Sequence, residues 1–144
     1  MKAGIRPFPG VKELVPLAAA RYPLAIASGA LRSEIEAIME RIGLRKYFQV
    51  IVSSEDTNEG KPDPEIFMKA LALLNQSQFE GQQLHPSECL VIEDSKEGIL
   101  GARRAGIKCL AVTNSHPAEE LKEADAVVPS LEEVTIAFLE QLVS

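Results

Sequence analysis

The sequence has few features of a secreted, membrane-spanning or nucleic-acid-binding protein. Only two of its 144 residues are cysteines, Cys89 and Cys109. Both lie within apolar runs, so we expect reduced core thiols in a cytoplasmic protein. No apolar run approaches the length of a bilayer span. Against 21 acidic residues there are 15 lysines and arginines, and the net charge of −6 argues against binding to nucleic acid or an anionic membrane.

The composition suits a single α/β domain over residues 1–144. Hydrophobic residues make up 46% and charged residues 25%, which is ordinary for a globular chain able to bury a core. Short apolar runs alternate with helical patterns. Continuous runs of this kind are typical of strands buried on both faces of a parallel sheet. The runs span residues 24–27, 50–52, 89–92, 109–112 and 126–128.

The segments between these runs predict helices. Apolar residues at helical spacing indicate helices over 9–22, 31–42, 63–74, 95–105 and 131–142, with a short one that starts near 115–117. Asp63 is suited to cap its helix and Pro64 to take the first position. Pro16 is expected to kink the opening helix or to shift its start. This alternation predicts a three-layer, doubly wound parallel sheet.

Polar residues and a glycine follow several of the apolar runs, at the point where each predicted strand ends or in the loop after it. They are Ser28, Gly29, Lys61, Glu93, Asp94 and Ser95. Because the carboxyl ends of parallel strands meet at one edge of a sheet, we expect these residues to converge. A hydroxyl, backbone N–H groups and an ammonium suit phosphate oxygens. Adjacent carboxylates, with phosphate as a further ligand, suit Mg²⁺.

Each of these residues also has a purely structural interpretation. A serine and a glycine after a strand usually form a turn, and one acid before a helix is often its cap. The dipeptide Gly60-Lys61 lacks the upstream glycine of a P-loop, and a lone loop lysine is more often solvated. Two adjacent acids ending an apolar strand repel each other without a cation, however. The combination is therefore more specific than any of its parts.

Three segments resemble the haloacid dehalogenase-like hydrolase superfamily, in particular its β-phosphoglucomutase and phosphoglycolate phosphatase subgroup. They are residues 26–29 (Ile-Ala-Ser-Gly), 60–67 (Gly-Lys-Pro-Asp-Pro-Glu-Ile-Phe) and 91–99 (Val-Ile-Glu-Asp-Ser-Lys-Glu-Gly-Ile). The resemblance extends over about residues 7–135. It implies a Rossmann-like core and Mg²⁺-dependent phosphoryl transfer or hydrolysis on a small phosphorylated metabolite.

The resemblance also implies roles for the residues that bind phosphate. Ser28, with the backbone N–H of Gly29, would hold the transferring phosphoryl oxygens. Lys61 would neutralise the phosphoryl group and the nucleophile, so Ser28 and Lys61 are the candidate catalytic residues. In this family an aspartate attacks phosphorus, and water then hydrolyses the aspartyl-phosphate.

Three further residues take metal-binding or supporting roles by the same resemblance. Glu93 and Asp94 would bind Mg²⁺. Ser95 would support the acidic loop and cap the helix that follows it.

The sequence lacks the Asp-x-Asp segment that supplies the attacking aspartate in this family. Its aspartates are Asp56, Asp63, Asp94 and Asp125. We also expect no cap domain within residues 1–144. The missing strand would lie centrally, between the strands that end at Ser28 and at Asp94. Unpaired buried backbone groups cost about 1–3 kcal/mol each. We therefore expect one of three outcomes: those two strands pair directly, a second chain or an N-terminal segment fills the gap, or the natural protein is longer than this sequence and the chain is truncated.

Two functional hypotheses remain open from the sequence. In the first, the chain is the core of a phosphatase or phosphosugar mutase and is inactive alone because the nucleophile is absent. In the second, it is a non-catalytic module that binds phosphate and Mg²⁺, or that offers an open sheet edge to a protein partner.

Overall fold

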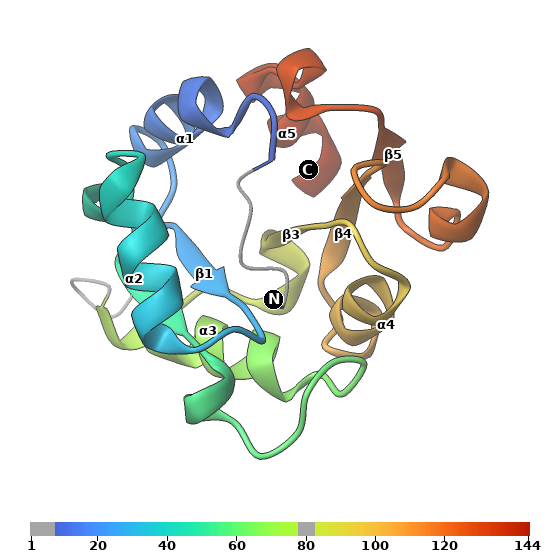
Figure 1. The fold of residues 1–144 in the computed structure, drawn as a ribbon. Helices are drawn as coiled ribbons and strands as arrows, with labels where there is room; N and C mark the ends of the chain where they lie inside the picture. The colour runs from blue at the N-terminus through green and yellow to red at the C-terminus, as the bar shows by residue number, and fades with distance from the viewer. Residues whose placement is uncertain (1–7, 78–82) are drawn as a thin grey trace.

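The computed structural model describes residues 8–77 and 83–144. Helices and strands alternate along these residues, as the βαβα pattern predicts (Figure 1). They are α1 Val11–Ala19, β1 Ala25–Ala27, α2 Arg32–Arg41, β2 Val50–Val52, α3 Glu65–Ser77, β3 Leu90–Glu93, α4 Lys96–Arg104, β4 Lys108–Val112, β5 Ala126–Val128 and α5 Ile136–Val143. Pro7, where the family resemblance begins, lies outside the described residues.

The strands are paired in parallel, but they form two small sheets instead of one. β1 pairs with β2, and the second sheet has the order β3-β4-β5. Within the described part of the chain β1 and β3 do not pair, so direct closure across the missing strand is not the outcome seen. All three residues of β1 and the first three of β3 are only partly buried, whereas β2 is fully buried.

Helices cover both faces of the strands, which confirms the three-layer prediction. In β4, Cys109 and Ala111 belong to the hydrophobic cluster that includes α3 and α4. The alternating residues Leu110 and Val112 pack in a second cluster with α1 and α5. Ile51 of β2 packs in a third cluster, against α1 and α2. Figure 1 shows α3 and α4 lying apart from α1 and α5.

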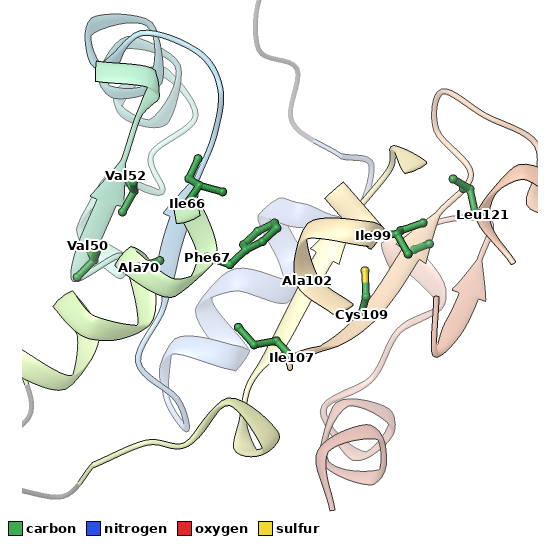
Figure 2. Packing of buried hydrophobic residues seen from close by; sticks show 11 residues of the cluster. Val50, Val52, Ile66, Phe67, Ala70, Ile99, Ala102, Ile107, Cys109 and Leu121 are labelled. Carbon is green, nitrogen blue, oxygen red and sulfur yellow. The ribbon is translucent and has the colours of Figure 1, made fainter. Parts of the chain in front are cut away.

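One hydrophobic cluster joins the two sheets. It contains Val50 and Val52 of β2 as well as Cys109 of β4, and Figure 2 shows Phe67 of α3 lying between them. Phe67 is 5% exposed. A Cβ added at Gly101 of α4 would lie 3.1 Å from Phe67 Cε2, so the aromatic ring packs directly on α4. This core fixes the two sheets relative to one another despite the absence of a ladder between β1 and β3 in the described residues.

The two helices that flank the predicted site begin with side-chain caps. Ser95 Oγ accepts a hydrogen bond from the N–H of Gly98 at 3.0 Å, as expected for the cap of α4. Asp63 Oδ1 accepts one from the N–H of Glu65 at 2.9 Å. Asp63 therefore caps α3 as predicted, although Pro64 precedes the first helical residue and does not occupy it.

One helix prediction is wrong. The helix expected over 131–142 is divided into a 3₁₀ turn, Leu131–Glu133, and α5, because Thr135 is extended and its hydroxyl caps α5. The short helix expected to start near 115–117 is present as a 3₁₀ helix over Ala118–Leu121, directly after Pro117. α1 starts before Pro16 and continues through it, so Pro16 does not set the start of the helix. None of the helices in the described ranges is long and apolar enough to cross a membrane.

Candidate active site

Lys61 connects the two sheets where β1 and β3 end. Its Nζ donates a hydrogen bond to Glu93 Oε2 at 2.8 Å and lies 3.5 Å from the carbonyl oxygen of Ala27. Ala27 ends β1 and directly precedes Ser28, while Glu93 ends β3. The Lys61 and Glu93 side chains are only 19% and 9% exposed, so solvent and salt screen their attraction weakly. The structure thus brings Lys61 to the ends of both strands, as the sequence predicts.

The Glu93 carboxylate accepts hydrogen bonds on both oxygens. Oε2 accepts from Lys61, and Oε1 accepts from the N–H of Asp94 at 3.0 Å and from Ser95 Oγ at 3.3 Å. Gly98 of α4 leaves room for this carboxylate, because a Cβ there would lie 2.0 Å from Glu93 Cδ. Glu93 is therefore a buried counter-ion for Lys61. Its role as an Mg²⁺ ligand stays a prediction, in which the metal competes with these donors.

Asp94 is the more accessible of the two acids. It is partly buried, and its Oδ2 accepts a hydrogen bond from Ser115 Oγ at 2.9 Å. Ser115 lies in the loop after β4, so three strand ends contribute to this region. Sequence reasoning missed Ser115, although its position shortly after an apolar run was a signal of the kind used for the other residues.

Ser28 and Gly29 directly follow the end of β1, where Ser28 is partly buried and Gly29 is exposed. The N–H of Ser28 donates to the Val52 carbonyl at 3.0 Å and extends the pairing with β2. Ser28 Oγ accepts from the N–H of Ala30 at 3.1 Å, which leaves its own proton available to donate. A Cβ added at Gly29 would meet nothing within 4 Å. A ligand oxygen can therefore approach Gly29, and the Ser28 hydroxyl lies one residue before it.

The loop between β2 and Lys61 is anchored by a buried serine. Ser53 is fully buried, and both its N–H and its hydroxyl donate to Asp56 Oδ2, at 2.8 and 3.0 Å. These two hydrogen bonds, the backbone one first, hold the pKa of Asp56 below its usual range. Lys69 Nζ donates to the Asp56 carbonyl at 2.7 Å, which ties the loop to α3.

Cys109 lies in the core beneath this region and is not a candidate nucleophile. Burial raises the pKa of its thiol to about 12, with smaller contributions from the Glu93 and Asp125 carboxylates. A thiol with such a pKa is protonated at neutral pH. Both Cys89 and Cys109 are free, and only Cys109 is buried.

The described residues only partly fit a metal site. They contain no group of three histidine, cysteine, aspartate or glutamate side chains placed to hold a metal ion. Asp94 offers one carboxylate, whereas Glu93 already receives donors on both oxygens. Mg²⁺ is commonly held by one or two carboxylates together with substrate phosphate and water. Asp94 fits such a set only if phosphate and a further acid complete it.

The fold and this geometry define a Rossmann-like α/β domain with an ammonium and two acids at the carboxyl ends of parallel strands. A family model described as haloacid dehalogenase-like hydrolase matches residues 1–112, and the chain belongs to this family. The resemblance stated from the three sequence segments is therefore confirmed.

Individual relatives support the same assignment. The chain is 39% identical over 122 residues to the chloroplastic 5-amino-6-(5-phospho-D-ribitylamino)uracil phosphatase of Arabidopsis thaliana, covering 85% of this chain and 31% of that protein. CbbY from Rhodobacter sphaeroides, solved in complex with phosphate, matches with a TM-score of 0.80 and 28% identity, over 92% of this chain and 58% of CbbY. β-Phosphoglucomutase from Clostridium difficile shares the fold, with a TM-score of 0.78 at 24% identity, over 94% of this chain and 56% of that one.

The chain is much shorter than these relatives. It spans between 31% and 53% of the length of the first four curated relatives it matches. The name of the Arabidopsis relative places that protein in the chloroplast, so the cytoplasmic location expected for this chain stays a prediction.

Proposed function

We propose that the chain provides the phosphate-holding and metal-holding half of a site for phosphoryl transfer or hydrolysis on a small phosphorylated metabolite. The observation that carries the proposal is the position of Lys61. Its ammonium lies between the Ala27 carbonyl and the Glu93 carboxylate, and Ala27 directly precedes Ser28 and the exposed Gly29. An ammonium, a hydroxyl and a backbone N–H at the end of one strand are donors suited to a phosphoryl group.

Each residue then has a defined task. Ser28 Oγ and the Gly29 N–H donate to phosphoryl oxygens and orient the group. Lys61 offsets the negative charge that develops on these oxygens, and Glu93 keeps the ammonium in place. Mg²⁺, when bound, would supply further positive charge to the phosphoryl oxygens, and Asp94 is the residue that would hold it. Ser95 orients Glu93 and caps α4.

The attacking aspartate is proposed to come from another segment, because the chain's own aspartates are engaged elsewhere. Asp56 accepts from Ser53, Asp63 caps α3, and Asp125 accepts from the N–H of Cys109 at 2.8 Å. Asp94, the remaining aspartate, is the residue assigned to Mg²⁺.

The facing edges of β1 and β3 are the proposed place for that segment. Ser28 directs its N–H toward β2, and since strand residues alternate, the carbonyl of Ala27 points away from β2. A parallel strand supplied by a second chain, or by an N-terminal segment, would pair with these edges and deliver an aspartate next to Lys61.

Turnover of p-nitrophenyl phosphate by the pure chain tests the catalytic part of the proposal. Without the added aspartate we expect no Mg²⁺-dependent hydrolysis above the background rate, for the chain and for Asp94→Asn alike. Clear Mg²⁺-dependent hydrolysis by the pure chain that disappears in Asp94→Asn would contradict the proposed need for a second segment.

A non-catalytic binding module is the second candidate, and the unpaired edges of β1 and β3 in the described residues favour it. Calorimetry with Mg²⁺ and a phosphate ester, together with a size measurement in solution, separates the two. Binding without turnover favours the module. A complex in which another strand is bound, with turnover, favours the completed enzyme.

A further inference from the structure

Glu65 folds back onto the loop that carries Lys61. It is the first residue of α3, and its Oε1 accepts hydrogen bonds from the backbone N–H groups of Asn58 at 3.1 Å and Glu59 at 2.9 Å. Its Oε2 lies 3.2 Å from the same N–H of Asn58. These amides stand three and two residues before Lys61. The Glu65 side chain therefore holds the part of the loop that precedes Lys61.

The outgoing side of the loop is fixed to the same helix. The N–H of Asp63 donates to the Gly60 carbonyl at 3.0 Å, and Asp63 Oδ1 accepts from the N–H of Glu65. The backbone therefore closes around Lys61 and returns to the start of α3. The next residues of α3, Ile66 and Phe67, are 2% and 5% exposed and anchor this point in the core.

α4 supports the same loop and also the partner of Lys61. The exposed Arg104 donates from Nη1 to the Pro62 carbonyl at 3.2 Å, so it ties α4 to the loop. The other end of α4 accommodates Glu93 through Ser95 and Gly98. Both members of the Lys61–Glu93 pair are thus located relative to α3 and α4.

We propose that Glu65 is a positioning residue for Lys61, acting through the amides of Asn58 and Glu59. It does not touch the phosphoryl group. By holding the loop against α3 it places the Lys61 ammonium between Ala27 and Glu93. The inference rests on the proposed function in that Lys61 is taken to bind phosphate.

Affinity for inorganic phosphate, followed by amide NMR of the full chain, tests this inference. Glu65→Ala should weaken binding about tenfold, because small misplacements of a positioned charge have large effects. Glu65→Gln keeps a carbonyl oxygen that accepts from both amides, so its affinity should stay within about threefold of the parent. Glu59→Ala is the matched control, since it removes a neighbouring exposed carboxylate and retains the backbone N–H.

Two outcomes of the binding experiment would overturn the inference. One is phosphate affinity in Glu65→Ala equal to the parent, with only the unfolding midpoint lowered, which would show a structural role alone. The other is equal loss in Glu65→Gln and Glu65→Ala, which would show that the charge of Glu65 acts directly.

A double-mutant cycle in the free energy of unfolding separates this inference from the proposed function. If Glu65 positions Lys61 against Glu93, Lys61→Met should destabilise the Glu65→Ala variant less than it destabilises the parent. The parent chain could fail to bind phosphate while the unfolding free energies are still non-additive. That result would refute the proposed function and would still support the positioning role. Strictly additive effects would refute the positioning role.

Discussion

Glu93 is the last residue of β3, and its carboxylate accepts hydrogen bonds from three donors. The position of this carboxylate depends on the small size of one glycine, Gly98. Lys61, the N–H of Asp94 and Ser95 Oγ surround its two oxygens. Gly98 lies so close that no larger residue fits while Glu93 keeps its place. At the scale of the residue, the contacts of the site therefore depend on one another, and adding a single methyl group at Gly98 would displace the Glu93 carboxylate.

Replacing Gly98 with alanine tests this dependence. The added methyl group must displace Glu93, and overpacking of this kind costs about 1–3 kcal/mol, offset by up to about 1 kcal/mol from the better helix propensity of alanine. We expect a net loss of about 1–2 kcal/mol in urea unfolding. Gly29→Ala is the control, because a Cβ there meets nothing within 4 Å. Equal stability of the two variants would show that Glu93 is free to move.

The pKa of Asp56 predicts how the free energy of unfolding depends on pH. Its folded-state pKa is lowered, first by the N–H of Ser53 and then by the Ser53 hydroxyl. The ionised carboxylate therefore stabilises the fold at pH above the unfolded value of about 3.9, and this contribution is lost as pH falls through the folded pKa. Asp56→Asn should be less stable than the parent at neutral pH, and urea titrations should show the difference shrinking below about pH 4. A difference that stays constant or grows in acid would contradict this assignment.

At the scale of the element, much of the structure could be predicted from the sequence. The apolar runs over 50–52 and 126–128 match β2 and β5. All three residues of β2 are buried, and residues buried on both faces of a sheet must be apolar at every position. The caps Asp63 and Ser95 were likewise predictable, since short polar side chains before a helical pattern satisfy its first N–H groups.

The remaining features depend on contacts between distant parts of the chain. The break before α5 occurs at Thr135, where the apolar spacing of 131–142 continues and hides the interruption. The hydrogen bond from Ser115 to Asp94 joins residues 21 positions apart. The division into two sheets also depends on tertiary packing, because the apolar runs of β1 and β3 do not show that these strands pair with β2 and β4 but not with each other in the described residues.

Thr135 offers a test at this scale. Its hydroxyl accepts from the N–H of Phe138 at 3.1 Å and caps α5. Thr135→Ala should destabilise the protein by about 1 kcal/mol, whereas Thr135→Ser keeps the hydroxyl and should differ by only a few tenths. Chemical denaturation measures both, and no loss in the alanine variant would show that α5 begins without help from this cap.

At the scale of the whole molecule, the two sheets are joined through a common core and not through a continuous ladder in the described residues. Phe67 lies between β2 and β4 within that core (Figure 2). Phe67→Ala should cost about 3–5 kcal/mol and lower hydrogen-exchange protection in both sheets together. Met68→Ala, at a neighbouring position that is 56% exposed, should change stability by less than about 0.5 kcal/mol. Loss of protection in one sheet alone would show that the halves unfold independently.

The central claim concerns phosphate at the ends of β1 and β3, next to Lys61. Titration of the isotope-labelled chain with inorganic phosphate in the presence of Mg²⁺, followed by amide NMR, tests it most directly. The amide signals of Ser28, Gly29 and Lys61 should shift together and saturate, and Lys61→Met should abolish the response. Shifts confined to other surfaces, or a response unchanged in Lys61→Met, would contradict the claim.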